Sequence, residues 1–162
     1  MAYEFTVVDY PKTLVAGLSI QTNLNKASMD CPALWQKFGP QIHSKLSQHV
    51  CMASTDTPAY GISKMIDNEF FDYWAAVPVK QEHELPKEFK TMTIPAGKYV
   101  KTTVPSLAKL SEAFMAMYTQ WPQQQDQYQL DPAGLCFETY DVCWKPEDSL
   151  EIYCKVIENQ GD

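Results

Sequence analysis

The order strand, helix, strand, strand occurs twice along this chain, and this duplication constrains the fold more than any single motif does. Pro32 opens the first expected helix, and Pro105-Ser106-Leu107 opens the second. Each helix is followed by two strands, which lie near Tyr60 and Trp74 in the first unit and near Cys136 and Ile152 in the second. Neither unit can cover a sheet face alone, so the two should merge into one core. We expect an α+β fold with a mostly antiparallel sheet, two main helices and a groove between the repeats.

Apolar periodicity and turn residues place the elements. Extended segments are expected over 5–21, with a bend at Pro11, and over 60–66, 71–79, 92–104, 135–140 and 150–157. The first helix should begin at Pro32 after a polar loop, kink at Gly39-Pro40 and continue to Val50. The second should have Ser106 as its N-cap and end at Pro122, before a glutamine-rich loop. We assign residues 1–162 to a single binding domain, with repeat one over about 3–80 and repeat two over about 90–157.

Composition excludes several classes of function. The chain has 162 residues and a formal net charge of −7, which argues against direct nucleic-acid binding because phosphate recognition needs a basic face. It shows no signal peptide and no apolar run of membrane-spanning length, so we expect a cytoplasmic protein without membrane contact. The cysteine count is odd at five, without a CxxC pair, so free thiols are expected. Cys136 and Cys154 are interpreted as small apolar strand residues.

Catalytic and cofactor motifs are missing. No HExxH motif occurs, and His43, His49 and His83 do not have zinc-site spacing to cysteines. The sequence also lacks GxGxxG, GxxxxGK[ST] and GxSxG. We therefore expect no metal and no cofactor.

The segment Cys136-Phe137-Glu138-Thr139-Tyr140 carries the strongest functional signal. Side chains alternate between the faces of a strand, so Glu138 shares a face with Cys136 and Tyr140, and Phe137 takes the other. A carboxylate among aromatic rings provides charge, stacking and cation–π contact for a flat organic cation. The alternative is a half-exposed strand whose glutamate is simply solvated.

Several short segments, in this order and spacing, resemble the gyrase-inhibitor-like small-molecule-binding family, which includes effector-binding domains of multidrug-responsive bacterial transcription activators. These segments are Leu14-Val15-Ala16-Gly17-Leu18, Pro32-Ala33-Leu34-Trp35, Ile94-Pro95-Ala96-Gly97-Lys98-Tyr99, Phe137-Glu138-Thr139-Tyr140 and Glu151-Ile152-Tyr153. The resemblance covers about residues 3–157 and implies a groove between two repeats with an acidic residue, here Glu138, that meets aromatic cations. Members often carry an N-terminal helix-turn-helix domain. This chain starts directly at the first strand, so we expect a stand-alone binder.

Aromatic residues supply the candidate wall of this site. Tyr140 shares the face of Glu138, whereas Tyr73 and Trp74 point to opposite faces of one strand, so at most one of them should line the groove. We favour Trp74, because its neighbour Ala76 leaves space for a ligand. Trp35 serves either as a wall or as helix-to-sheet packing. The remaining candidates are Tyr60, Tyr99 and Tyr118.

Two other functions remain open. A related hydrolase activity would open strained electrophilic natural products with Glu138 as general base, and a second carboxylate from Asp72 or Glu69 would help. A gyrase-directed inhibitor would bind protein through its acidic surface, although the acids form no long run. The sequence leaves a protein partner or a homodimer open.

Overall fold

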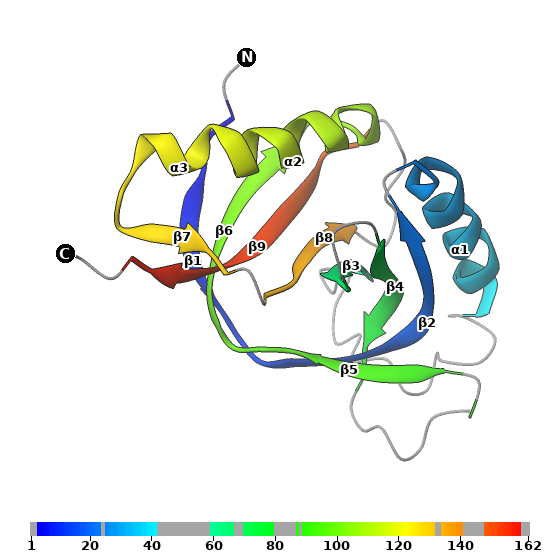
Figure 1. The fold of residues 1–162 in the computed structure, drawn as a ribbon. Helices are drawn as coiled ribbons and strands as arrows, with labels where there is room; N and C mark the ends of the chain where they lie inside the picture. The colour runs from blue at the N-terminus through cyan, green and yellow to red at the C-terminus, as the bar shows by residue number, and fades with distance from the viewer. Residues whose placement is uncertain are drawn as a thin grey trace.

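The computed structural model describes residues 3–23, 25–41, 59–66, 70–79, 87, 89–131, 134–140 and 148–159. These residues form a curled, nine-stranded sheet with helices on its outer side (Figure 1). Strand order is β1-β6-β9-β8-β3-β4-β2-β5, and β7 pairs with β9 off this path. Neighbouring strands are antiparallel. The expected α+β fold with two main helices is confirmed.

The strands are β1 (Thr6–Tyr10), β2 (Thr13–Asn23), β3 (Ala59–Met65), β4 (Phe70–Pro78), β5 (Lys90–Ile94), β6 (Gly97–Val104), β7 (Tyr128–Leu130), β8 (Cys136–Tyr140) and β9 (Leu150–Glu158). The helices are α1 (Ala27–Gln41), α2 (Leu110–Thr119) and α3 (Trp121–Gln124), with the 3₁₀ turn η2 (Leu107–Lys109) before α2. As expected, the first extended segment is interrupted at Pro11. A turn also separates β5 from β6, where Gly97 has a φ of +153° that suits glycine.

Helix α1 begins five residues before the predicted start at Pro32. The side-chain oxygen of Asn23 accepts hydrogen bonds from the backbone amides of Asn25 and Lys26. The carbonyl of Lys26 then accepts the amide of Asp30 at 2.8 Å, which closes the first helical turn. This local cap positions the helix, so Pro32 and Pro40 both lie inside it. The predicted continuation to Val50 lies outside the described residues.

The second helical segment is divided where a single helix was predicted. Helix α2 ends at Thr119, and Pro122 lies in the first turn of α3 instead of ending a helix. Proline suits this position because the first turn of a helix has no partner for its amide. Ser106 makes no side-chain cap; its backbone carbonyl accepts the amide of Lys109 instead. The glutamine-rich segment is therefore partly α3 and β7 and not a plain loop.

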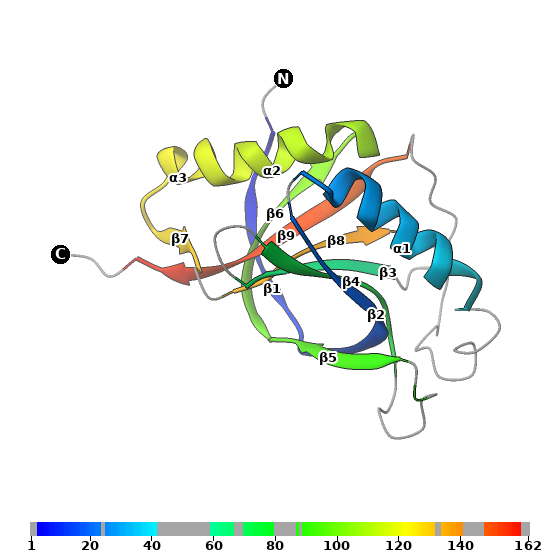
Figure 2. The same cartoon turned by 45° about the vertical axis from the view of Figure 1, so that its right-hand side comes forward.

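The sheet is symmetric in its order about the β3–β8 junction. On one side of this junction the order runs β3, β4, β2, and on the other side it runs β8, β9, β6. Helix α1 packs on the first side through Leu34 and Phe38, and α2 packs on the second through Ala113 and Met117. Figures 1 and 2 show both helices outside the curl, one over each half.

A third cluster fills the inner side of the curl and contains no helical residue. We call it the inner cluster; it comprises Val15, Tyr60, Ile62, Ala76, Ile94, Tyr99, Leu135, Phe137 and Tyr153. The partly buried Tyr10 packs against it, with its ring 5.0 Å from that of Phe137 and 5.3 Å from that of Tyr153. Such close, tilted aromatic pairs stabilise a core beyond their buried area. The inner cluster therefore holds the curled sheet together, and the outer face remains for the helices.

Cys136 and Cys154 form a disulfide between β8 and β9, so the prediction of free thiols is wrong for this pair. Their Cα atoms are 4.2 Å apart because they lie directly opposite each other in the ladder. Among the described residues, Cys31 is a free cysteine. None of the helices in the described part of the chain is both long and apolar enough to cross a membrane.

Candidate functional site

Glu138 lies at the boundary between the two halves of the sheet. It is on β8, opposite Gly61 of β3 on one side and Ile152 of β9 on the other. Its side chain is on the outer face, because Glu138 pairs with Ile152 of the cluster under α2 and is hydrogen-bonded to Tyr73 of the cluster under α1. Only 4% of the residue is exposed. The alternative of a solvated glutamate is therefore wrong.

Two tyrosines hold the buried carboxylate. Tyr73 on β4 donates its hydroxyl to Oε1 of Glu138 at 2.7 Å, and Tyr140 on β8 donates to the same oxygen at 2.6 Å. The indole N–H of Trp35, on α1, donates to the Tyr73 hydroxyl at 2.8 Å. The rings of Trp35 and Tyr140 meet edge to face at 5.5 Å. A continuous hydrogen-bonded chain thus runs from α1 through β4 to the carboxylate.

Burial and hydrogen bonding act in opposite directions on Glu138. Burial raises the pKa of the carboxyl group because the charged form loses its hydration. The hydrogen bonds from Tyr140 and Tyr73 favour the charged form and lower that pKa, yet burial dominates. Burial also raises the pKa of both tyrosines well above the usual value, and the nearby Glu138 raises them further. Both tyrosines therefore remain protonated donors at neutral pH.

Gly61 provides the space for this carboxylate. A Cβ atom at position 61 would overlap Oε1 of Glu138 and the hydroxyl oxygen of Tyr73. Apolar periodicity does not single out Gly61, although a glycine inside a strand is a known signal of close approach by another group. Cys31 on α1 was likewise not predicted to lie near the site; its pKa is raised to about 12 by burial and then by the charges of Glu138 and Asp30.

The predicted wall residues divide between the two faces of the sheet. Trp35, Tyr73 and Tyr140 surround Glu138 on the outer face. Trp74 packs against the inner cluster, so the preference for Trp74 over Tyr73 is wrong. Side-chain alternation shows that the two residues differ in face, but the face that Glu138 shares depends on the pairing of β3 with β4 and β8.

The other three candidates lie farther from the carboxylate. Tyr60 and Tyr99 belong to the inner cluster, and the Tyr60 hydroxyl is hydrogen-bonded to that of Tyr10 at 2.6 Å. The structure therefore does not bring them together with Glu138. Tyr118 on α2 is 48% exposed, and its hydroxyl lies 3.4 Å from the sulfur of Cys136, one step along the outer face of β8 from Glu138. It reaches the edge of the site from the side of α2.

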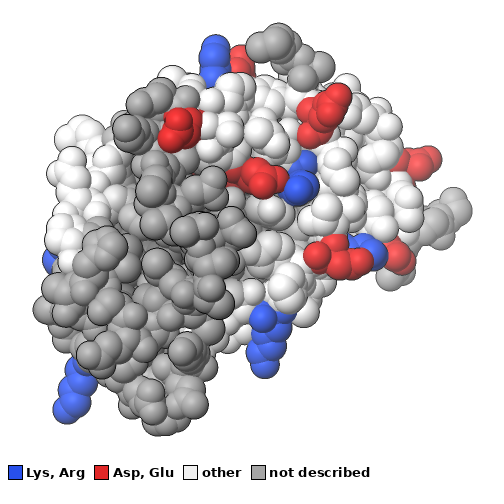
Figure 3. Space-filling model, turned by 180° about the vertical axis from the view of Figure 1, so that it is seen from behind, with Lys and Arg blue, Asp and Glu red and all other residues white. Residues whose placement is uncertain are grey.

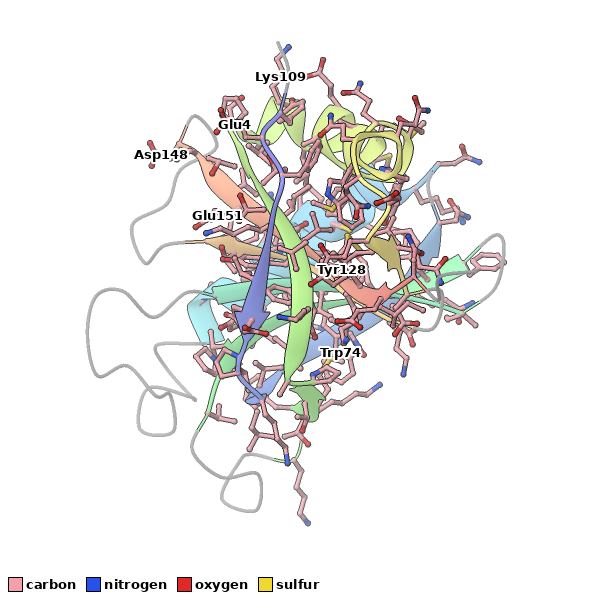
Figure 4. All side chains as sticks on the ribbon, turned by 90° about the vertical axis from the view of Figure 1, so that its left-hand side faces the viewer. Glu4, Trp74, Lys109, Tyr128, Asp148 and Glu151 are labelled. Atoms are coloured by element: carbon pink, nitrogen blue, oxygen red, sulfur yellow. A yellow bond between two sulfur atoms is a disulfide. The ribbon has the colours of Figure 1, made fainter. Side chains whose placement is uncertain are left out.

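Two surface hollows are lined by described residues, and Glu138 lines neither of them. One has a volume of about 430 Å³ and includes Glu4 and Lys109; the other, of about 300 Å³, includes Glu151 (Figure 4). Neither is the groove expected between the repeats, because Glu138 at that boundary is covered by packed side chains.

Other chemistry has less support in the described residues. Nowhere in the described ranges do three His, Cys, Asp or Glu side chains gather as metal ligands; His43, His49 and His83 lie outside them. Asp72 neighbours Tyr73 on β4, so it points to the opposite face from the site. The second candidate carboxylate, Glu69, lies outside the described residues.

The charged surface is mixed. On the face opposite to that of Figure 1, acidic and lysine side chains are interspersed over the part that the structure describes (Figure 3). The ion pairs Lys98–Asp9 and Lys101–Glu151, both at 3.1 Å, are examples of this pattern. Such interspersed charge does not form the continuous basic stripe that phosphate backbones require.

Solved structures share this fold. The most similar include SAV2435 bound to tetraphenylphosphonium, at 15% identity and a TM-score of 0.74 over 97% of this chain and 94% of that chain. The C-terminal domain of EcmrR aligns at 15% identity and 0.68 over 98% and 100% of the chains. A hydrolase from Listeria innocua aligns at 10% identity and 0.58 over 95% and 92%. At such identities the likeness shows the fold alone.

The family follows from a comparison with family models, since a search of curated proteins yields no match. The family model described as Cass2, integron-associated effector binding protein, matches residues 6–156. This match confirms the expected kinship with gyrase-inhibitor-like effector-binding domains. Because it covers nearly the whole chain, the chain belongs to the integron-associated effector-binding protein family.

Proposed function

We propose that this protein binds lipophilic aromatic cations, with Glu138 as the counter-ion of the guest. One observation carries the proposal: a carboxylate that is 4% exposed lies among Trp35, Tyr73 and Tyr140, and within the described part of the chain none of the ion pairs includes it. Two hydroxyl groups compensate only part of its lost hydration, since its pKa is still raised. A delocalised cation would supply the missing opposite charge and place its rings against aromatic walls.

The enclosed geometry favours large, flat or propeller-shaped cations over small ones. A small cation such as ammonium would lose strong hydration on burial, whereas an aromatic cation has a diffuse charge and an apolar surface to bury. Tyr118 extends the aromatic surface on the side of α2. In this proposal Tyr118 contacts the part of the guest farthest from Glu138, and Trp35 contacts its near side.

The solved relatives support this class of guest. SAV2435 was solved with tetraphenylphosphonium, a propeller-shaped aromatic cation, and EcmrR has a C-terminal domain of the same fold. We infer a cytoplasmic location, where effector-responsive regulation of transcription takes place. We also propose that the protein acts with a protein partner or as a homodimer. We also infer one binding domain built from two repeats, over about 3–80 and about 90–157.

Titration with two oppositely charged guests tests the proposal. Tetraphenylphosphonium and tetraphenylborate have nearly the same shape and opposite charge, so calorimetry with both isolates the role of charge. We expect the cation alone to bind. Glu138→Gln should weaken its binding by about 1–3 kcal/mol, the usual cost of losing a desolvated charged partner.

Glu151→Gln is the matched control. Glu151 is also on the sheet, but it is half-buried on the opposite face and pairs with Lys101. Its substitution should leave cation affinity unchanged. Equal binding of both guests by the wild-type protein would refute the charge role of Glu138. Loss of folding in Glu138→Gln, seen by circular dichroism, would make Glu138 a structural residue.

The hydrolase alternative has weaker support. General-base catalysis by Glu138 would benefit from a second acid group, and Asp72 points to the opposite face. Incubation with a strained electrophilic compound, followed by mass spectrometry, decides between the two functions. An unchanged compound leaves binding as the activity of the site.

A further inference from the structure

We propose that Cys136 and Cys154 are a reversible dithiol–disulfide pair, and that its oxidation state controls how readily the Glu138 site opens to a cation. The first part stands on the geometry of the two cysteines. The second part rests on the proposed function.

Strand pairing holds the two sulfurs together whether or not they are bonded. Cys136 and Cys154 are opposite each other in the antiparallel β8–β9 ladder. The amide of Lys155 donates to the carbonyl of Leu135 at 3.1 Å, which makes the next pair, Cys136–Cys154, a non-hydrogen-bonded one. Side chains are closest at such pairs. After reduction the ladder still keeps the thiols adjacent, so the bond can form again without rearrangement of the backbone.

The pair is accessible from one side only. Cys154 is 1% exposed, whereas Cys136 is half-buried. The hydroxyl of Tyr118 lies 3.4 Å from the Cys136 sulfur, and 48% of Tyr118 is exposed. A reductant can therefore reach Cys136 when the Tyr118 side chain turns away, but it cannot reach Cys154 directly.

The reaction is a two-electron thiol–disulfide exchange with a dithiol reductant of the thioredoxin class. One reductant thiolate attacks the Cys136 sulfur, a mixed disulfide forms, and Cys154 leaves as a thiolate that takes up a proton. The second reductant thiolate then attacks its own partner sulfur and releases Cys136, which is also protonated. The reductant ends as a disulfide and the protein as two thiols. Oxidation runs through the same steps in reverse.

The pair lies where it can influence Glu138. Cys136 and Glu138 are two residues apart on the same face of β8, and their partners Cys154 and Ile152 are likewise two apart on β9. Among the described residues the β8–β9 ladder has four pairs, and Cys136–Cys154 is the first of them, so the covalent bond restrains the strand segment that holds Glu138. Because Glu138 is enclosed, a guest can reach it only if the surrounding side chains and strand β8 move apart. The disulfide should oppose this displacement, and reduction of the disulfide should make it easier.

A redox titration tests the first part. In the variant C31S/C51S/C143S only this pair can react. The folded protein is equilibrated with mixtures of oxidised and reduced dithiothreitol, quenched with acid, denatured and alkylated with iodoacetamide. Mass spectrometry should show one transition from no labelled cysteine to two, with circular dichroism unchanged. Labelling of both cysteines in every mixture, or reduction only after denaturation, would overturn the proposal.

Stopped-flow binding of tetraphenylphosphonium tests the second part. In the same background, the reduced form should associate several-fold faster than the oxidised form. The further variant C136S/C154S should match the reduced form in either buffer. Identical rates for the two redox forms would overturn the coupling. If neither form binds the cation, the proposed function and the coupling both fall, whereas the labelling experiment still decides whether the pair is reversible.

Discussion

Gly61 and Glu138 lie directly opposite each other in the β3–β8 ladder, and the missing side chain of Gly61 leaves the room that the Glu138 carboxylate occupies. The two residues hold equivalent places, since Gly61 also pairs with Ala75 of β4 and Glu138 with Ile152 of β9. One half of the sheet therefore contributes the charge, and the other contributes the space for it.

The substitution Gly61→Ala should expel the carboxylate from this space. Its Cβ would overlap Glu138 and the Tyr73 hydroxyl, and overpacking of this kind costs about 1–3 kcal/mol of stability. Urea unfolding measures the loss, and calorimetry should show weaker cation binding. The same substitution in a Glu138→Ala background should cost clearly less, because one of the overlapping groups is gone. An equal cost in both backgrounds would contradict this account of Gly61.

Cation affinity should increase with pH. The pKa of Glu138 is raised by burial, so the carboxyl group is neutral below that pKa and charged above it. Tetraphenylphosphonium has no titratable group, and its dissociation constant from about pH 4 to about pH 8 therefore reports protonation of the protein. Glu138→Gln should give a nearly flat profile. A wild-type profile as flat as that of the variant would exclude Glu138 as the counter-ion.

The stability of the free protein should have the opposite pH dependence. Between the ordinary pKa of an unfolded glutamate and the raised pKa of Glu138, the native state binds more protons than the unfolded state does. The free energy of unfolding must then fall as pH rises through this window. Glu138→Gln has no carboxyl group to titrate, so its free energy of unfolding should not fall in this window. The free energy of unfolding of the variant minus that of the wild type should therefore increase with pH and then level off. Urea unfolding at a series of pH values measures this difference, and a decrease with rising pH would contradict the prediction.

Removal of the Tyr73 hydroxyl should shift the midpoint of the binding profile. Tyr73 is one of two donors that lower the pKa of Glu138, so Tyr73→Phe should raise that pKa and move the midpoint to higher pH. Tyr60→Phe is the matched control, because the Tyr60 hydroxyl bonds to Tyr10 in the inner cluster. An equal shift in both variants would indicate a general structural effect.

Tryptophan fluorescence should distinguish the two faces of the sheet. Trp35 contacts Tyr73 and Tyr140 beside the carboxylate, whereas Trp74 packs against the inner cluster. Quenching by tetraphenylphosphonium should therefore be largely lost in Trp35→Phe and retained in Trp74→Phe. The reverse result would place the guest on the inner side of the curl.

The sequence predicted the architecture well because strand and helix periodicity are local properties. The ends of the helices were less predictable. Helix α1 starts early because the Asn23 side chain captures two amides, and α2 and α3 separate at Gln120. The first effect depends on hydrogen bonds of a loop side chain, which periodicity does not encode.

Prediction of the site was limited by strand register. Alternation placed Glu138 and Tyr140 on one face, and the structure brings the two side chains together. The choice between Tyr73 and Trp74, the place of Gly61 and the Cys136–Cys154 bond all depend on which strand pairs with which, and at what offset. Such long-range pairing is set by the whole sheet and not by any single segment.

The β3–β8 ladder is the place where the strand order passes from one half of the described sheet to the other. A guest held beside it would touch elements of both halves at once, because Trp35 belongs to α1 and Tyr118 to α2. Binding of a guest at this interface would thus change the orientation of α1 relative to α2. A partner protein in contact with both helices would respond to that change, so the same residues would bind the guest and transmit its presence.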